Sequence, residues 1–179
     1  MGNDGPVTST RLITLDDVPV LADLIAANRE FLAPWEPTRP ESYFTAAGQL
    51  AVTEKLLSLH GDGTNLPHVL LDDSDRIIGR ITLNEIVRGP LQSCSLGYWV
   101  TAAENGRGVA SEAVRQFLRL AFDDLELHRV QAGTLVHNVR SQRVLEKNGF
   151  TRYGLAPTYL RIAGEWQDHI LFQIINPRA

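Results

Sequence analysis

The spacing of hydrophobic and polar positions along the chain predicts four helices. The first begins at Thr14, which has the capping-box spacing to Asp17, and ends near Phe31, before two prolines. The apolar face of this helix is formed by Val18, Leu21, Ala22 and Ile25. Further helices are predicted over residues 42–60, closed by glycines, over residues 110–121, and over residues 138–147.

Short apolar or alternating runs predict the strands between these helices. They lie at residues 68–71, 76–86, 94–100 and 129–136, with the turn-forming residues 72–75 between the first two. Two more strands near the C-terminal end meet at a turn around Ala163 and Gly164. Helices and strands alternate, with antiparallel hairpins mixed in, which predicts an α/β fold with a mixed sheet covered by helices.

No internal repeat, low-complexity tract or linker divides the 179 residues, so we expect a single domain over residues 10–177 after a ragged tail, residues 1–9. No apolar run approaches the roughly 20 residues of a membrane span. A net charge of −4 disfavours a nucleic-acid partner. Cys94 is the single cysteine, which indicates a reducing compartment, and we expect a cytoplasmic protein.

The segment that carries most information about chemistry is the glycine-containing loop before the third helix. Gly106 and Gly108 allow a tight turn and a close approach of backbone N–H groups to a ligand. The helix that follows directs its positive dipole end to the same place, and Arg107 adds a charge. The loop is therefore suited to a pyrophosphate, although a plain strand-to-helix turn would look similar. Spacing alone leaves the ligand open, because neither a Walker motif nor a full dinucleotide fingerprint is present.

Together with residues 138–150, this loop resembles the GNAT (Gcn5-related N-acetyltransferase) superfamily. The superfamily signature Arg/Gln-x-x-Gly-x-Gly/Ala falls on Asn105, Gly108 and Ala110, and Asn105 departs from its first position. The resemblance implies a GNAT-like central mixed sheet with helices on both faces. It also implies that acetyl-CoA lies in the gap between two splayed parallel strands.

Several dispersed segments are similar, more narrowly, to the bacterial ribosomal-protein alanine N-acetyltransferases, and most similar to the RimJ type. They are residues 31–37, 39, 41–42, 87–89, 96–98, 137–138, 159–160 and 164–169. This resemblance implies transfer of acetyl to the N-terminal α-amine of a protein, by direct attack in a ternary complex. We expect a monomer or homodimer. Two alternatives stay open: acetylation of a small amine such as a polyamine, amino sugar or antibiotic, and a non-catalytic module that binds CoA.

The resemblance also implies roles for individual residues. The backbone of Tyr98, Trp99 and Val100 is expected to bind the pantetheine arm and the thioester carbonyl, and Asn138 to reach that arm from the other strand. The pyrophosphate is expected at Asn105, Gly106, Arg107, Gly108, Val109, Ala110 and Ser111. The acceptor groove is expected to be lined by Trp35, Glu36 and Arg39, with Asp168 and His169 opposite; Trp35 could equally anchor the core, and the Asp-His pair could be structural.

Two catalytic roles remain to be filled. Many superfamily members protonate the leaving thiolate with a tyrosine where this chain has Leu145, so Ser141 is the nearest substitute, unless it only caps the helix. Glu85 is the first candidate for the base that deprotonates the amine, or else a solvated charge at a strand end. Cys94 is expected to be a buried core residue rather than a nucleophile. The five histidines have no metal-ligand spacing, so no metal is expected.

Overall fold

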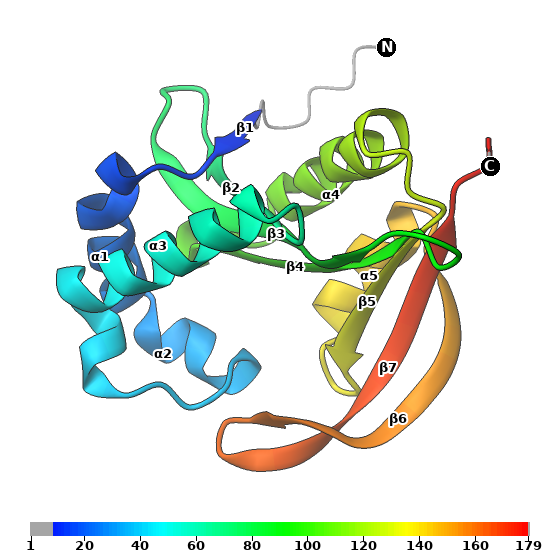
Figure 1. The fold of residues 1–179 in the computed structure, drawn as a ribbon. Helices are drawn as coiled ribbons and strands as arrows, with labels where there is room; N and C mark the ends of the chain where they lie inside the picture. The colour runs from blue at the N-terminus through cyan, green and yellow to red at the C-terminus, as the bar shows by residue number, and fades with distance from the viewer. Residues whose placement is uncertain (1–8, 179) are drawn as a thin grey trace.

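The computed structural model describes residues 9–178, which contain one seven-stranded mixed sheet of order β1-β2-β3-β4-β5-β7-β6 (Figure 1). The strands are β1 (Ser9–Leu12), β2 (Leu66–Leu71), β3 (Ile77–Val87), β4 (Ser93–Val100), β5 (Arg129–Leu135), β6 (Thr151–Ile162) and β7 (Glu165–Ile175). All neighbours are antiparallel except β4 and β5. The predicted mixed sheet is confirmed.

The helices also follow the predicted segments. They are α1 (Val18–Ala27), α2 (Arg29–Leu32), α3 (Ala46–Gly61), α4 (Val109–Arg119) and α5 (Val139–Lys147). The capping box forms, because the Thr14 N–H donates to the Asp17 carboxylate at 2.8 Å. The helix predicted from residue 42 begins later, at Ala46. Thr45 caps it by accepting from the Gly48 N–H at 3.1 Å, and residues 41–44 form a separate 3₁₀ turn.

The sequence pattern missed β1, a strand of four residues with no fully buried position. Ser9, expected in the N-terminal tail, is the first residue of this strand. It pairs with Leu71 at one edge of the sheet. The other residues of the expected tail, 1–8, lie outside the described part of the chain.

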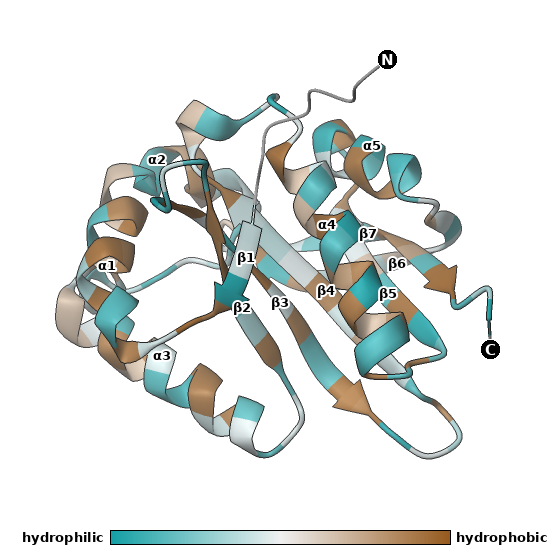
Figure 2. Ribbon diagram, turned by 90° about the horizontal axis from the view of Figure 1, so that it is seen from above, coloured by the Kyte–Doolittle hydropathy of each residue, from teal (hydrophilic) through white to brown (hydrophobic). Residues whose placement is uncertain are grey.

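Neighbouring side chains of β2 point into two different cores. Leu70 packs in a large cluster that includes Phe117 of α4, whereas Val69 and Leu71 pack in a smaller cluster with Leu21 of α1. This alternation follows from the two-residue period of a strand. Figure 2 shows α1 and α3 on one side of the strands and α4 and α5 on the other. The expectation of helices on both faces is therefore confirmed.

The parallel pair β4–β5 is joined only at its beginning. Ser93, Cys94 and Ser95 pair with residues 129–131, and no later residue of β4 pairs with β5. β4 continues to Val100 alongside β3, and β5 continues to Leu135 alongside β7. The two strands therefore diverge toward their carboxyl ends, as the family resemblance implied. Within the described residues, no helix is long and apolar enough to cross a membrane.

Candidate active site

The divergence of β4 and β5 leaves a cavity of about 160 Å³ between them. Residues 96–98 and 132–135 form its two strand walls. The rest of its lining is Trp35, Asn138, Ser141, Leu145 and His169. Five residues expected in the site from the sequence are thus brought together from four separate segments of the chain, namely Trp35, Tyr98, Asn138 with Ser141, and His169.

Tyr98 and Ser141 meet on the side of the cavity that faces α4 and α5. Their hydroxyl oxygens are 2.9 Å apart. Asn138 accepts from the Ser141 N–H at 3.1 Å and so caps α5, which fixes Ser141 at the first turn of that helix. Burial raises the pKa of Tyr98 to about 12, against the opposing effect of the Ser141 hydrogen bond, so the phenol keeps its proton near neutral pH.

The sequence assigned a role only to the backbone of Tyr98, and the side-chain contact was missed. Leu96, Tyr98 and Val100 alternate along β4 and pack against the same core as α4. The alternation of these residues along the strand could have predicted that the Tyr98 side chain points toward α4 and α5. Trp99 points the opposite way and packs against the smaller cluster that contains Leu21.

His169 and Asp168 point away from each other, as adjacent residues of a strand do. The His169 side chain is buried and lines the cavity. Asp168 is exposed and accepts a hydrogen bond from the Thr158 N–H at 2.8 Å, where β6 is bulged and Thr158 has a φ of 46°. The two residues therefore form no pair, and Asp168 stabilises the bulge between Ala156 and Leu160, which contains Tyr159.

A second cavity, of about 280 Å³, lies beside Trp35 and is lined by Glu36 and Arg39. Arg39 stacks on the Tyr43 ring, 4.6 Å from its centroid. Burial raises the pKa of Glu36, although Arg39 and Arg80 act in the opposite direction. The Glu36 backbone carbonyl accepts from the Ala163 N–H at 3.0 Å, so the β6–β7 turn is held against the segment that carries Trp35 and Glu36.

The glycine loop has the geometry of an anion site. Gly106 and Gly108 have φ values of 81° and 86°, in the left-handed region that favours glycine. The first hydrogen bond of α4 runs from Glu112 to the Gly108 carbonyl. Within residues 9–178, the N–H groups of residues 108–111 have no hydrogen-bond acceptor, so they are free for an anion.

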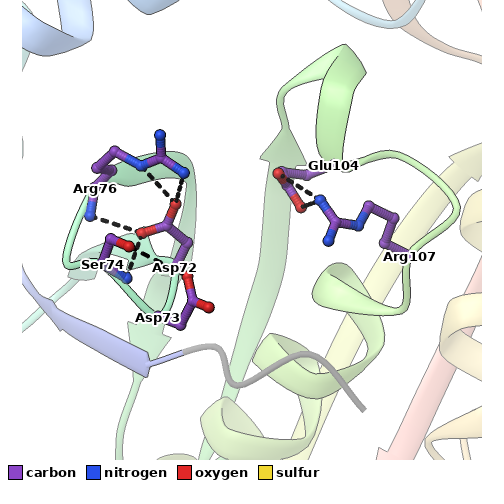
Figure 3. Close-up of polar contacts among 6 residues, drawn as sticks. All are labelled: Asp72, Asp73, Ser74, Arg76, Glu104 and Arg107. Carbon is purple, nitrogen blue, oxygen red and sulfur yellow. Dashed lines mark hydrogen bonds and ion pairs between the residues drawn. The ribbon is translucent and has the colours of Figure 1, made fainter. Parts of the chain in front are cut away.

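The side chains around this loop are engaged with each other. Arg107 forms an ion pair with Glu104 at 3.0 Å (Figure 3), so its charge is partly neutralised rather than directed at the loop. The Ser111 hydroxyl accepts from the Asn148 amide at 3.1 Å and ties α4 to the end of α5. The backbone of the loop therefore offers a better anion site than its side chains do.

A family model described as an acetyltransferase (GNAT) domain matches residues 10–151. The diverging parallel strands and the free N–H groups at the start of α4 agree with this match. The chain belongs to the GNAT acetyltransferase family. It is accordingly an enzyme, an acetyl-CoA-dependent N-acetyltransferase.

Relatives within the GNAT family are similar over nearly the whole chain. The [ribosomal protein uS5]-alanine N-acetyltransferase of Escherichia coli is 36% identical, over 93% of this chain and 87% of that protein. The structure of the ribosomal-protein-S5-alanine acetyltransferase of Vibrio fischeri has a TM-score of 0.90 and 34% identity, covering 95% of this chain and 93% of that one. The structure of Mycobacterium smegmatis RimJ in complex with CoA-disulfide has a TM-score of 0.93 and 28% identity, with 97% and 84% covered.

Glu85, the base expected from the sequence, lies elsewhere in this GNAT fold. It occupies a bulge of β3 between Asn84 and Val87, with a φ of 52°, beside the paired beginning of β4. Its cavity is a third one, shared with Thr64 and Asn65, and the lining of the splayed cavity does not include it. The register of β3 explains the difference, because Asn84 already lies opposite Ser95, in the part of β4 that is paired with β5. The bulge then changes the direction of the Glu85 side chain.

Cys94 is buried at the paired beginning of β4. Burial raises the pKa of its thiol to about 12, so near neutral pH it stays protonated and is a poor nucleophile. The expected core role of Cys94 agrees with this position. In the described part of the chain, no three histidine, cysteine, aspartate or glutamate side chains come close enough together to hold a metal ion.

Proposed function

We propose that this GNAT enzyme transfers acetyl from acetyl-CoA to the N-terminal α-amine of a protein, and that the acceptor is a ribosomal protein of the alanine-starting type. The observation that carries the proposal is the cavity between β4 and β5. It is lined from both faces of the sheet, with Ser141 on one side and Trp35 on the other. The thioester therefore has room to enter from the α4 side and the amine from the α1 side.

The size of the cavity favours a slender acceptor. Its volume of about 160 Å³ is smaller than the roughly 300–1,000 Å³ of pockets that enclose drug-sized ligands. The end of an extended peptide with a small first residue fits such a space better than a whole amino sugar. The neighbouring cavity, with the half-buried Glu36 carboxylate and Arg39, offers groups of both charges to the rest of the acceptor.

The basicity of the amine favours the same acceptor. An α-amine has a pKa of about 8.0 and a lysine side chain one of about 10.4. The difference of about 2.4 units makes deprotonation of the α-amine easier by roughly 3.3 kcal/mol. An N-terminus therefore requires a weaker base than a lysine or a polyamine does.

Acetyl-CoA is the donor that the geometry accommodates. The free N–H groups at the start of α4 are suited to its pyrophosphate, and the edge of β4 from residue 96 onward is open to its pantetheine arm. Backbone donors on that edge would stabilise the oxyanion formed when the amine attacks. Ser141 would donate a proton to the departing thiolate while accepting a hydrogen bond from Tyr98.

The names of the relatives supply the finer part of the proposal. The Escherichia coli and Vibrio fischeri proteins are named for a ribosomal-protein alanine acceptor, and this chain is 36% and 34% identical to them. Such an acceptor is made in the cytoplasm, which agrees with the compartment expected from the sequence.

The test uses two peptides that start with Ala and contain Lys, one with a free and one with a blocked α-amine. Mass spectrometry should find a single acetyl group on the α-amine of the first and almost none on the second. Equal turnover of both peptides would exclude α-amine selectivity. A marked preference for a polyamine or an aminoglycoside over either peptide would favour the small-molecule alternative. Thiol release that does not depend on any acceptor would count against an N-acetyltransferase of this kind.

A further inference from the structure

We propose that His169 is the general base that removes the proton from the acceptor amine. Nδ1 of His169 is 3.0 Å from the backbone carbonyl oxygen of Gln167. A carbonyl oxygen only accepts hydrogen bonds, so Nδ1 must be the donor. The neutral imidazole is therefore the Nδ1–H tautomer, and Nε2 carries the lone pair. Within residues 9–178, Nε2 has no hydrogen-bond partner.

The imidazole is held in one orientation from three directions. The Gln167 carbonyl fixes Nδ1, and the Tyr159 ring packs against the imidazole at 5.5 Å, inclined by 60°. On the third side is Gly133 of β5, where an added Cβ would lie 3.7 Å from His169 Cδ2, the atom bonded to Nε2. The absence of a side chain at Gly133 leaves the Nε2 edge beside the open wall of the cavity. A base is effective only when its orientation is fixed in this way.

His169 lies on the face of the sheet opposite the Ser141–Tyr98 pair. It pairs with Leu135, whereas the residue after it, Ile170, pairs with Thr134 and packs in the core beneath α4. His169 therefore faces the side of α1, where Trp35 enters the cavity. One cavity thus has a proton acceptor on the amine side and a proton donor on the thioester side, which is the arrangement that aminolysis of a thioester requires.

No other residue of the cavity can take this role near neutral pH. Its lining contains no carboxylate, lysine or arginine, and Tyr98 keeps its proton. The three carboxylates considered for the site are occupied or face elsewhere: Asp168 binds the Thr158 N–H, Glu36 lines the neighbouring cavity, and Glu85 lines a third. Imidazole is also the most frequent general base in enzymes.

Each bond change in the reaction is accompanied by a proton transfer. The ammonium gives one proton to Nε2 and from there to solvent, and the free amine forms the C–N bond to the thioester carbonyl. As the C–S bond breaks, the nitrogen gives its second proton to His169, which releases it to solvent. The sulfur takes a proton from Ser141, and Ser141 is reprotonated from solvent. The products are the acetamide, the CoA thiol and one proton.

The experiment compares two substitutions that mimic opposite halves of the imidazole. His169→Asn retains a donor at the position of Nδ1 and loses Nε2, whereas His169→Gln retains an amide near Nε2 and loses the contact with Gln167. Both variants should lose about 10²-fold in kcat, with an unchanged KM for acetyl-CoA. A merely structural histidine would be rescued by Asn, because that variant preserves the hydrogen bond.

The pH dependence provides the second readout. Without a base, kcat/KM of the variants should rise about tenfold per pH unit up to the pKa of the acceptor amine, more steeply than for the wild type. The role of His169 rests on the amine entering the splayed cavity, not on which amine it is. The rates are therefore measured with whichever acceptor the wild type turns over fastest: the Ala peptide, spermidine or an aminoglycoside. Poor use of the peptide would then count against the proposed acceptor alone.

A loss below tenfold in both variants, or a loss that is the same at every pH, would overturn the role of His169. If neither variant folds, ¹⁵N NMR of the histidines in the wild-type enzyme decides the question. The proposal requires one histidine as the Nδ1–H tautomer, with an Nε2 signal that moves when a CoA–peptide bisubstrate analogue binds. Absence of such a histidine would contradict it.

Discussion

Replacing Ser141 by alanine should separate chemistry from binding in this enzyme. The Ser141 hydroxyl lies 2.9 Å from the Tyr98 hydroxyl, inside the cavity expected to hold the thioester. Loss of a positioned proton donor costs about 10²-fold in rate, which corresponds to about 2.7 kcal/mol of activation free energy. The affinity for CoA should hardly change, because the substitution leaves the free N–H groups of residues 108–111 in place.

Tyr98→Phe is the matched control for this variant. It removes the partner of Ser141 but leaves the serine hydroxyl in place, so kcat should fall by about tenfold only. Ser141→Ala also leaves the Tyr98 hydroxyl without its partner, at a cost of about 1–3 kcal/mol in the free energy of unfolding. The double variant should therefore lose less stability and less activity than the sum of the two single variants.

The assay is steady-state release of CoA thiol at saturating acetyl-CoA, with calorimetric titration of CoA as the binding measurement. Single-turnover rates establish that chemistry, and not product release, limits kcat. An unchanged single-turnover rate in Ser141→Ala would refute the proton-donor role. Strictly additive effects of the two substitutions would refute the idea that Ser141 and Tyr98 act together.

Three further outcomes are expected. Gly108→Trp should weaken acetyl-CoA binding at least tenfold by calorimetry while the fold is retained. A side chain at a φ of 86° is strained and would block the anion site. An affinity equal to that of the wild type would contradict this expectation. Glu36→Gln should raise Tm near neutral pH, because burial raises the pKa of Glu36 and disfavours its ionised form in the folded state. The gain in Tm should vanish as the pH falls and Glu36 is protonated. A gain in Tm that is the same at every pH would contradict this explanation. Cys94→Ala should keep wild-type kcat and lose about 1 kcal/mol in the free energy of unfolding, whereas a large drop in kcat would reopen a role for the thiol.

Local patterns predicted most of the fold because the signals are contained in short segments. The Thr14/Asp17 capping box and the apolar stripe of α4 required only neighbouring residues, and both formed. The glycine loop was equally readable, since a positive φ at Gly106 and Gly108 follows from the residue type. β1 was missed because four half-exposed residues carry too little periodicity to stand out.

The site could be predicted only in part. The resemblance to a family brought Tyr98, Asn138, Ser141 and His169 into consideration, and the structure places all four in one cavity. Glu85 was chosen because it is a carboxylate near the end of a predicted strand. The register of β3 against β4, which no local pattern revealed, places it beside the closed beginning of the β4–β5 pair and in a different cavity.

The sequence by itself determined most of the elements, the mixed sheet covered by helices and the geometry of the glycine loop, because these depend on periodicity and on backbone preferences within a few residues. Only the tertiary structure decided which side chains share the cavity. Tyr98 and Ser141 are 43 residues apart in the chain, and the His169 side chain of β7 lines a cavity whose other walls come from β4, β5 and α5. The Tyr98–Ser141 contact joins β4 to α5 beside the gap that opens where β4 and β5 stop pairing, and no local signal in the sequence marks where that pairing ends.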